Sequence, residues 1–285
     1  MRRIIDAHCH IYPDGISRRA VDAVDRFYDG LPSDHYDGKV ETLLRIGRES
    51  GVTHFVVHSV ATRPEQVRSI NQFIARSVKD AEGAFIGMGT MHPDSTDQEH
   101  DFRELIDMGL HGVKLHPDIQ QFCADDPRVM PIYAMCEEAG CPVCVHTGDY
   151  RYDYSNPERI VKILKAFPRL KMIGAHFGGW SVWEDAVRVL PEFPNLMVDT
   201  SSSFYWLEKQ RAKEIIRAYG PERVMYGTDY PLWPMQPEID ALLAMDFTED
   251  EYERIFWKNA AELFGLNLEG EDDSNECEKT GLCNR

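Results

Sequence analysis

Two histidines, His8 and His10, stand one residue apart near the start of the chain, at the end of a short apolar run. Side chains two positions apart on a β-strand point to one face, with Cα atoms about 6.6 Å apart. The two imidazoles can therefore converge on one metal ion. A single pair of this kind is a weak indication, because histidine is also common as a satisfied core residue. The prediction of a metal site depends on whether other segments bring further ligands.

Several later apolar runs also end in polar residues. These residues are His116, His146, His176 and Asp229. In a barrel of parallel strands, the carboxyl ends of the strands surround one mouth, where active sites are built. Imidazoles together with one carboxylate suit zinc or a similar divalent transition ion. If the chain forms such a barrel, residues far apart in the sequence become ligands of one site.

Eight short apolar runs alternate with amphipathic stretches, the pattern of repeated strand–helix units. The runs are residues 3–8, 52–58, 84–90, 112–116, 142–147, 171–176, 196–200 and 224–228. Eight such units in 285 residues predict an α/β fold with a single-domain (β/α)8 TIM barrel. The alternative is a doubly wound open sheet, but that fold needs a glycine-rich phosphate loop after the first strand. The first strand here ends in His8, Cys9 and His10 instead, which favours the barrel.

Helices are predicted between the strands. Residues 65–79 have apolar positions at three- and four-residue spacing. A helix at residues 40–49 should end at Gly51, because glycine readily adopts the left-handed conformation that ends helices. Asn156 followed by Pro157 predicts the start of another helix, with Asn156 as its cap.

Composition limits the function classes. The formal net charge is −17, from 31 basic and 48 acidic residues. Such a field repels phosphate backbones, so we expect a small-molecule substrate and no nucleic-acid binding; a homo-oligomer is compatible with this composition. No stretch approaches the ~18 consecutive apolar residues of a membrane span, and the first residues do not resemble a secretory signal. We therefore predict a cytoplasmic protein without membrane binding, with a barrel at residues 1–268 and an acidic, flexible tail at residues 269–285.

As a set, these motifs resemble the amidohydrolase superfamily, and within it the amidohydrolase-2 branch, which contains hydrolases, lactonases and decarboxylases. The resembling segments follow the family's order from residue 4 to residue 265. They are DAHCH at 6–10 with Pro13, GVKLHP at 112–117, VH at 145–146, HFGG at 176–179, GTDYP at 227–231 and NAAELFG at 259–265. The resemblance implies a metal site at the C-terminal mouth of the barrel strands.

The resemblance also implies roles for individual residues. It implies one divalent ion, with zinc as the first expectation and manganese or another transition metal as alternatives. The implied ligands are His8, His10, His146 and Asp229. His176 is the implied acid/base beside a metal-bound water, and relatives also use the residue matching Asp229 as a base. Relatives with two metal ions use a carboxylated lysine on the fourth strand, where this chain has Lys114.

Other polar residues have two interpretations each. Lys114 and His116 share the strand parity of residues that face the barrel lumen, so we interpret them as substrate contacts or ligands of a second metal ion. Arg63 and Arg151 could offer forked donors to a substrate carboxylate, or they could be ordinary solvated arginines. His58 is interpreted as structural, because no partner motif accompanies it.

The chemistry follows from these residues. A metal ion held by imidazoles and a carboxylate can lower the pKa of bound water to ~7, and His176 can exchange a proton with that water. We therefore predict a metal-dependent hydrolase of a small organic acid, lactone or amide. The alternative is a non-oxidative decarboxylase of an unsaturated or aromatic carboxylic acid. A metal-binding protein without catalysis is disfavoured, because a structural zinc site closes its fourth position with protein ligands.

Overall fold

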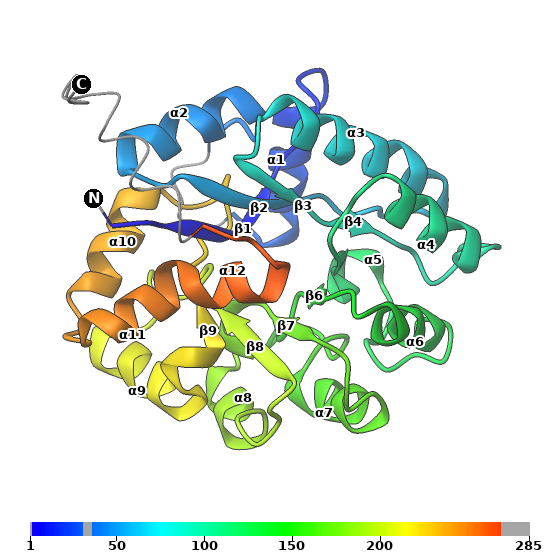
Figure 1. The fold of residues 1–285 in the computed structure, drawn as a ribbon. Coiled ribbons are helices and arrows are strands. Elements are labelled where there is room, and N and C mark those ends of the chain that lie inside the picture. Colours follow the sequence, from blue (N-terminus) through cyan, green and yellow to red (C-terminus); the bar gives the residue numbers. More distant parts are fainter. Residues whose placement is uncertain (1, 31–35, 269–285) are drawn as a thin grey trace, which may run out of the picture.

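The apolar runs of the sequence form parallel strands that are surrounded by helices (Figure 1). The structure, a computed structural model, describes residues 2–30 and 36–268. The strands are β1 (Ile5–His10), β2 (His54–His58), β3 (Phe85–Gly87), β4 (Gly89–Thr90), β5 (Val113–Leu115), β6 (Val143–Val145), β7 (Met172–Gly174), β8 (Leu196–Asp199) and β9 (Val224–Met225). The predicted acidic tail at residues 269–285 lies outside the described residues.

Two hydrogen-bonded sets of strands, β1-β2-β3 and β4 to β9, meet at Met88. The Met88 N–H donates to the carbonyl of Val57, and the Gly89 N–H donates to the carbonyl of Gly112, both at 2.9 Å. The consecutive residues Met88 and Gly89 therefore hydrogen-bond to β2 on one side and to the residue before β5 on the other. β3 and β4 together form the one barrel strand that was predicted at residues 84–90.

The ring closes between β9 and β1. The Ala7 N–H donates to the carbonyl of Tyr226 at 2.8 Å, and the Asp229 N–H donates to the carbonyl of His8 at 2.9 Å. Neighbouring strands are parallel throughout. The predicted (β/α)8 barrel is therefore confirmed, and its last strand places Asp229 directly beside the first strand.

Helices cover the outside of this barrel (Figure 1). They are α1 (Ser17–Phe27), α2 (Val40–Ser50), α3 (Val67–Asp80), α4 (Gln98–Asp107), α5 (Pro117–Gln120), α6 (Met130–Ala139), α7 (Pro157–Ala166), α8 (Trp183–Val189), α9 (Lys209–Tyr219), α10 (Met235–Leu243), α11 (Glu249–Glu253) and α12 (Asn259–Phe264). α2 ends as predicted at Gly51, which has a φ of 73°. α1 is an additional helix between β1 and β2 that the sequence analysis did not identify.

The start of α7 differs from the prediction in one respect. The helix begins at Pro157, but the Asn156 side chain does not cap it. Instead, Asn156 Oδ1 accepts a hydrogen bond from the Asp149 N–H at 3.1 Å, and its Nδ2 donates to the carbonyl of Tyr152 at 3.1 Å. The asparagine therefore stabilises the loop after β6, which begins with His146.

Apolar side chains also fill the barrel lumen at the amino ends of the strands. The lumen cluster includes Ile5, Val56, Ile86, Ile173 and Met225. Ala260, Ala261 and Phe264 of α12 pack against it, and α12 lies across this end of the barrel (Figure 1). Polar strand-end residues therefore remain at the opposite, carboxyl end.

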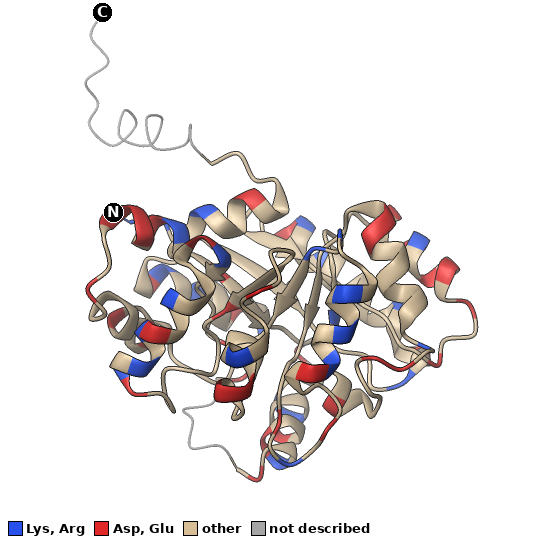
Figure 2. Ribbon diagram, turned by 90° about the horizontal axis from the view of Figure 1, so that it is seen from below, with Lys and Arg blue, Asp and Glu red and all other residues tan. Residues whose placement is uncertain are grey.

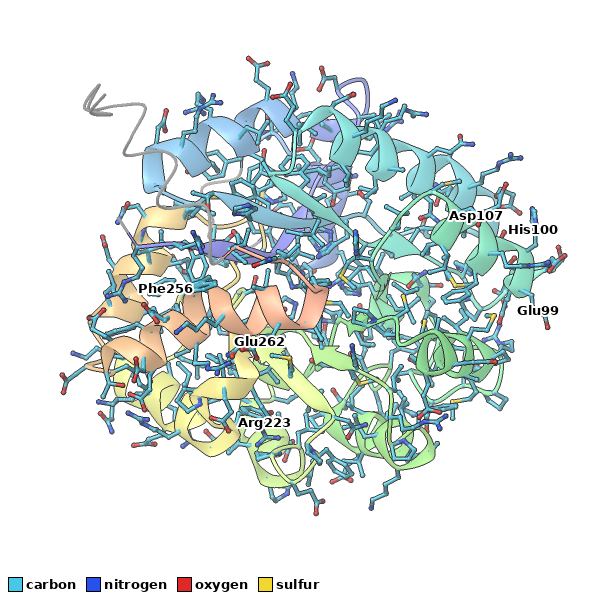
Figure 3. All side chains as sticks on the ribbon, in the orientation of Figure 1. Glu99, His100, Asp107, Arg223, Phe256 and Glu262 are labelled. Carbon is cyan, nitrogen blue, oxygen red and sulfur yellow. The ribbon has the colours of Figure 1, made fainter. Side chains whose placement is uncertain are left out.

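The outer helices carry acidic and basic residues side by side (Figure 2). His100 on α4 points away from the barrel (Figure 3), and 56% of its side chain is exposed. Within residues 2–30 and 36–268, no helix combines the length and apolar character that a membrane span requires.

Gly148, after β6, allows two loops to approach closely. Its φ is 82°, and a Cβ at this position would lie 2.6 Å from the carbonyl carbon of Gly179. We expect Gly148→Ala to lower the free energy of unfolding by about 3 kcal/mol or more, since positive φ and a backbone clash both add strain. Denaturant unfolding measures the loss.

Gly109→Ala is the matched control. Gly109 has a φ of 75°, but nothing lies within 4 Å of the position of its Cβ. This variant should lose only the cost of the left-handed conformation, about 1–2 kcal/mol. Equal losses in the two variants would contradict the importance of the close approach.

Candidate metal centre

His8 and His10 on β1 lie beside Asp229 at the mouth of the barrel. The Asp229 Oδ1 atom is 3.5 Å from His8 Nε2 and 3.4 Å from His10 Nε2. Ligand bonds of about 2.1 Å in a tetrahedral shell separate ligand atoms by about 3.4 Å. The three atoms are therefore spaced as ligands of one ion. Asp229 has a φ of 65°, a costly conformation that is enriched at functional sites, and the Asp6 carboxylate accepts from the preceding Thr228 N–H at 3.0 Å.

Asp199, the last residue of β8, orients His8. Its Oδ2 accepts a hydrogen bond from His8 Nδ1 at 2.8 Å, and its Oδ1 accepts from the backbone N–H of His176 at 3.0 Å. With the proton on Nδ1, His8 keeps the lone pair of Nε2 for an ion in the mouth. Asp199 was not among the residues predicted from the sequence, although it stands at the polar end of the run at residues 196–200.

His146 and His176 face each other across the same space. His146 Nδ1 lies 3.0 Å from His176 Nε2. The opposite nitrogen of each ring is near a backbone carbonyl: His146 Nε2 is 3.2 Å from Gly148 O, and His176 Nδ1 is 2.9 Å from Ser201 O. A carbonyl can only accept, so these outer nitrogens carry the protons of the neutral rings. Two lone pairs then face each other, which requires a shared proton or a cation between them.

Lys114 reaches the same cluster from β5. Its Nζ donates to His8 Nε2 at 3.0 Å and to Cys144 Sγ at 3.5 Å, and the side chain is buried. Lys114 therefore faces the lumen, as its strand parity predicted. Because the ammonium group uses the lone pair that a metal ion would need, an ion bound to His8 must displace this hydrogen bond.

His116 lies against His146, with ring centroids 3.9 Å apart and planes 7° apart. His116 Nδ1 accepts from the Ile119 N–H at 3.3 Å, so in the neutral ring Nε2 carries the proton. That nitrogen is 3.1 Å from the hydroxyl oxygen of Tyr28, which follows α1. The Tyr28 oxygen therefore accepts from His116, and its own hydrogen remains available for a ligand.

The two arginines considered for a substrate carboxylate lie elsewhere. Arg151 donates from Nε and Nη2 to the two carboxylate oxygens of Asp149 at 3.0 and 2.7 Å, and from Nη1 to the carbonyl of Phe27 at 2.6 Å. Its guanidinium thus joins the loop after β6 to the end of α1. Arg63 is exposed before the 3-10 turn Pro64–Gln66. Among the described residues, neither arginine lines the cavity at the mouth.

That cavity has a volume of about 830 Å³. Six polar residues of the cluster line it: His10, Lys114, His116, His146, His176 and Asp229. Burial lowers the pKa of the imidazoles His8, His10, His116 and His146 well below the usual value, and lowers the pKa of His176 to about 4. The rings are therefore neutral near pH 7, with lone pairs available to a metal ion.

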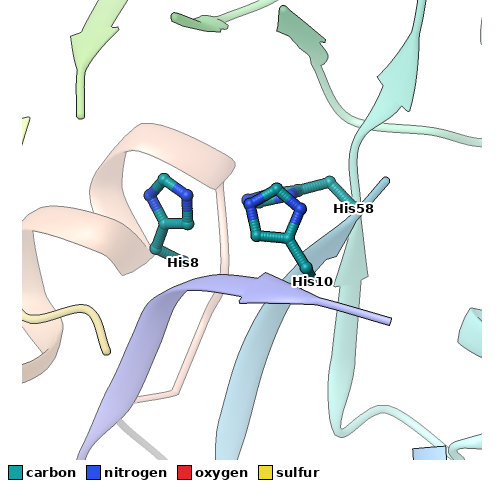
Figure 4. A group of neighbouring side chains, drawn as sticks. All are labelled: His8, His10 and His58. Atoms are coloured by element: carbon teal, nitrogen blue, oxygen red, sulfur yellow. The ribbon is translucent and has the colours of Figure 1, made fainter. Parts of the chain in front are cut away.

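His58, the last residue of β2, lies beside His8 and His10 (Figure 4). Its ring centroid is 4.7 Å from that of His8 and 4.4 Å from that of His10, and ligand nitrogens of the three residues lie within 4.8 Å of one another. His58 is buried, and neither ring nitrogen has a hydrogen-bond partner among the described residues. Buried polar groups are normally paired. The structure therefore places His58 with the candidate ligands, where the sequence analysis had interpreted it as structural.

Comparisons with known proteins identify the family of this chain. The amidohydrolase family model matches residues 5–266. The chain belongs to the amidohydrolase family. The resemblance drawn from the motifs is thereby confirmed.

One curated relative is the 2-amino-3-carboxymuconate-6-semialdehyde decarboxylase of Dictyostelium discoideum, which is 23% identical over 239 residues. The match covers 70% of this chain and 66% of the relative, just under two thirds of the relative's length.

Two solved structures show the same architecture. An uncharacterised TIM-barrel protein of Bordetella bronchiseptica has a TM-score of 0.79 at 23% identity, over 93% of this chain and 99% of the other. The 5-carboxyvanillate decarboxylase of Novosphingobium aromaticivorans, in complex with manganese and 4-hydroxy-3-methoxy-5-nitrobenzoic acid, has a TM-score of 0.73 at 17% identity, over 93% and 96% of the two chains. At these identities the matches establish the barrel fold.

The contact of Asp199 with His8 gives a testable prediction. Asp199→Asn should weaken binding of a divalent ion by about 10–100-fold. The negative charge of Asp199 orients the His8 ring and makes its Nε2 more basic, and the variant loses that charge. Titration against a chelator measures the affinity. Asp185→Asn, which changes a carboxylate on the exposed side of α8, is the control and should bind the ion normally. Unchanged affinity in Asp199→Asn would contradict the assigned role.

His58 provides a second prediction. His58→Phe keeps an aromatic ring of similar size and removes both unpaired nitrogens. We expect weaker metal binding by about tenfold or more, the effect of losing a group that supports a metal site. His54→Phe, at the opposite end of β2, should leave the affinity unchanged. Equal affinities in both variants would return His58 to a structural role.

Proposed function

We propose that this chain is a metal-dependent decarboxylase, which removes carbon dioxide without oxidation from an unsaturated or aromatic carboxylic acid. The spacing of His8, His10 and Asp229 as ligands of one ion, at a cavity that a substrate can enter, carries the proposal. The names of the relatives support the reaction: the curated relative and one structural match are decarboxylases of such acids. The sequence alone placed hydrolysis first, since the core motif serves both reactions.

The donor atoms fit a divalent transition ion. We assign His8, His10 and Asp229 as ligands, with His146 directed at the same space. Imidazole-rich sets suit zinc, and the manganese of the Novosphingobium enzyme makes that ion the second candidate. When bound, the ion supplies positive charge that anchors the substrate and stabilises the negative charge formed as carbon dioxide leaves.

His176 is the proposed proton carrier. Burial lowers its pKa to about 4, so the ring is neutral near pH 7 and must first accept a proton from an acidic group of the substrate. The charge of Asp199 beside it favours the protonated ring. As the bond to the carboxyl carbon breaks, its electron pair remains on the substrate carbon, and His176 Nε2 returns the proton to that carbon.

The reaction is tested with a panel of unsaturated acids, aromatic acids, lactones and amides, and with the metal-loaded protein. We expect carbon dioxide from at least one acid, in equal amount to the decarboxylated product, and none after chelation. Mass spectrometry and carbon dioxide detection measure both products. Hydrolysis of a lactone or amide without carbon dioxide release from any acid would overturn the proposal in favour of a hydrolase.

The role of His176 is tested separately. His176→Asn should retain the metal ion but lower kcat by about 10²–10⁴-fold, the usual contribution of proton transfer. His100→Asn on the outer face of α4 is the control. Metal content is measured by elemental analysis, and kcat by carbon dioxide release. Loss of the ion from His176→Asn would instead make His176 a ligand.

A further inference from the structure

The cavity extends well beyond the metal centre, between α1 and α3. Along α3 its wall runs from Gln66, just before the helix, to Arg76, and along α1 from Ile16, just before the helix, to the end of the helix. Ten residues of helix rise about 15 Å. Apolar residues form much of this wall: Ile16, Ala20, Val24, Phe27, Ile70 and Phe73. A volume of about 830 Å³ lies in the upper part of the range of about 300–1,000 Å³ for drug-sized ligands. A single-ring acid would leave much of this space unused.

The charges along the cavity differ from those of the whole chain. Arg19, Arg26 and Arg76 line it and are exposed, and none has an ion-pair or hydrogen-bond partner among the described residues. Neighbouring arginines outside the cavity are paired: Arg18 with Asp22, and Arg68 with Glu104. The only described carboxylate in the lining is that of the proposed ligand Asp229. In a chain with a net charge of −17, this is a locally positive site.

We propose that the substrate is an elongated amphipathic acid. Its reacting carboxylate lies at the metal centre, its apolar body lies between α1 and α3, and a second anionic group binds among the arginines that line these two helices, Arg19, Arg26 and Arg76. This inference rests on the proposed function for the position of the reacting end. Guanidinium groups suit the far end, because they bind carboxylates and phosphates through paired, charge-assisted hydrogen bonds.

The length of the wall sets the length of the test ligand. An extended chain advances about 1.2 Å per bond, so about 15 Å corresponds to about a dozen bonds. Dodecanedioate, dodecanoate and butanedioate therefore form a suitable set. The first two differ only in the second carboxylate, and the first and third differ only in the apolar body. Isothermal titration calorimetry on the metal-loaded protein measures binding without requiring turnover.

We expect dodecanedioate to bind at least about tenfold more tightly than dodecanoate or butanedioate. Dodecanoate lacks the second carboxylate and its charge-assisted contact, and butanedioate lacks most of the apolar surface that would be buried. The triple variant Arg19→Gln, Arg26→Gln, Arg76→Gln should lower the affinity for dodecanedioate to that for dodecanoate, with metal content unchanged. The triple variant Arg18→Gln, Arg45→Gln, Arg68→Gln makes the same change in net charge outside the cavity and should keep the preference.

Equal affinity for the mono- and diacid in the unaltered protein would overturn the inference. So would a dimer that dissociates on Phe73→Asp, because a second copy of the chain would then occupy the groove. Failure of the proposed function gives a different result: no acid would release carbon dioxide, while the arginine-dependent preference for the diacid would persist. If small acids release carbon dioxide but the protein shows no preference for the diacid over the monoacid, the proposed function stands and only the elongated substrate is contradicted.

Discussion

The candidate metal centre depends on one constraint: the lone pairs of several buried imidazole nitrogens point into the same space, and too few hydrogen-bond donors face them. The outer ring nitrogen of His8 donates a hydrogen bond to Asp199. The outer nitrogens of His146 and His176 donate to the carbonyls of Gly148 and Ser201. The inner nitrogens of these three rings can therefore only accept. Such an arrangement is unfavourable for buried side chains, and Lys114 relieves it only at His8. A shared proton or a bound cation would resolve the rest. The barrel holds the ends of β1, β6 and β7 in place, and this keeps the rings of His8, His146 and His176 close together.

The fold was largely predictable because each barrel strand is a short apolar run that ends in a polar residue. His8, His10, His146, His176 and Asp229 were found for the same reason: their position at strand ends is visible in the chain. Asp199 was missed because its role depends on two partners that are remote in sequence. Tyr28 was missed because α1, which carries it to His116, has no strand-end signal. Arg151 was left with two interpretations, because only the folded loop shows that its guanidinium donates to Asp149.

The choice between hydrolysis and decarboxylation lies outside the core motif. Both reactions need a positive centre and a nearby imidazole that changes its protonation state. What separates them is how the substrate is held, and the residues of α1 and α3 that line the cavity have no diagnostic spacing in the sequence. The neutral state of His176 is also a property of burial in the folded chain, and no sequence pattern reports it.

The helix α12 has a further consequence for how the enzyme operates. It packs against the amino end of the lumen, and in the part of the chain that the structure describes the cavity at the metal centre opens at the carboxyl end. A ligand that fills the space between α1 and α3 occupies the entrance of this cavity. Under the proposed function, such a ligand would cover the metal centre, so the ion would bind before the substrate and leave after the organic product.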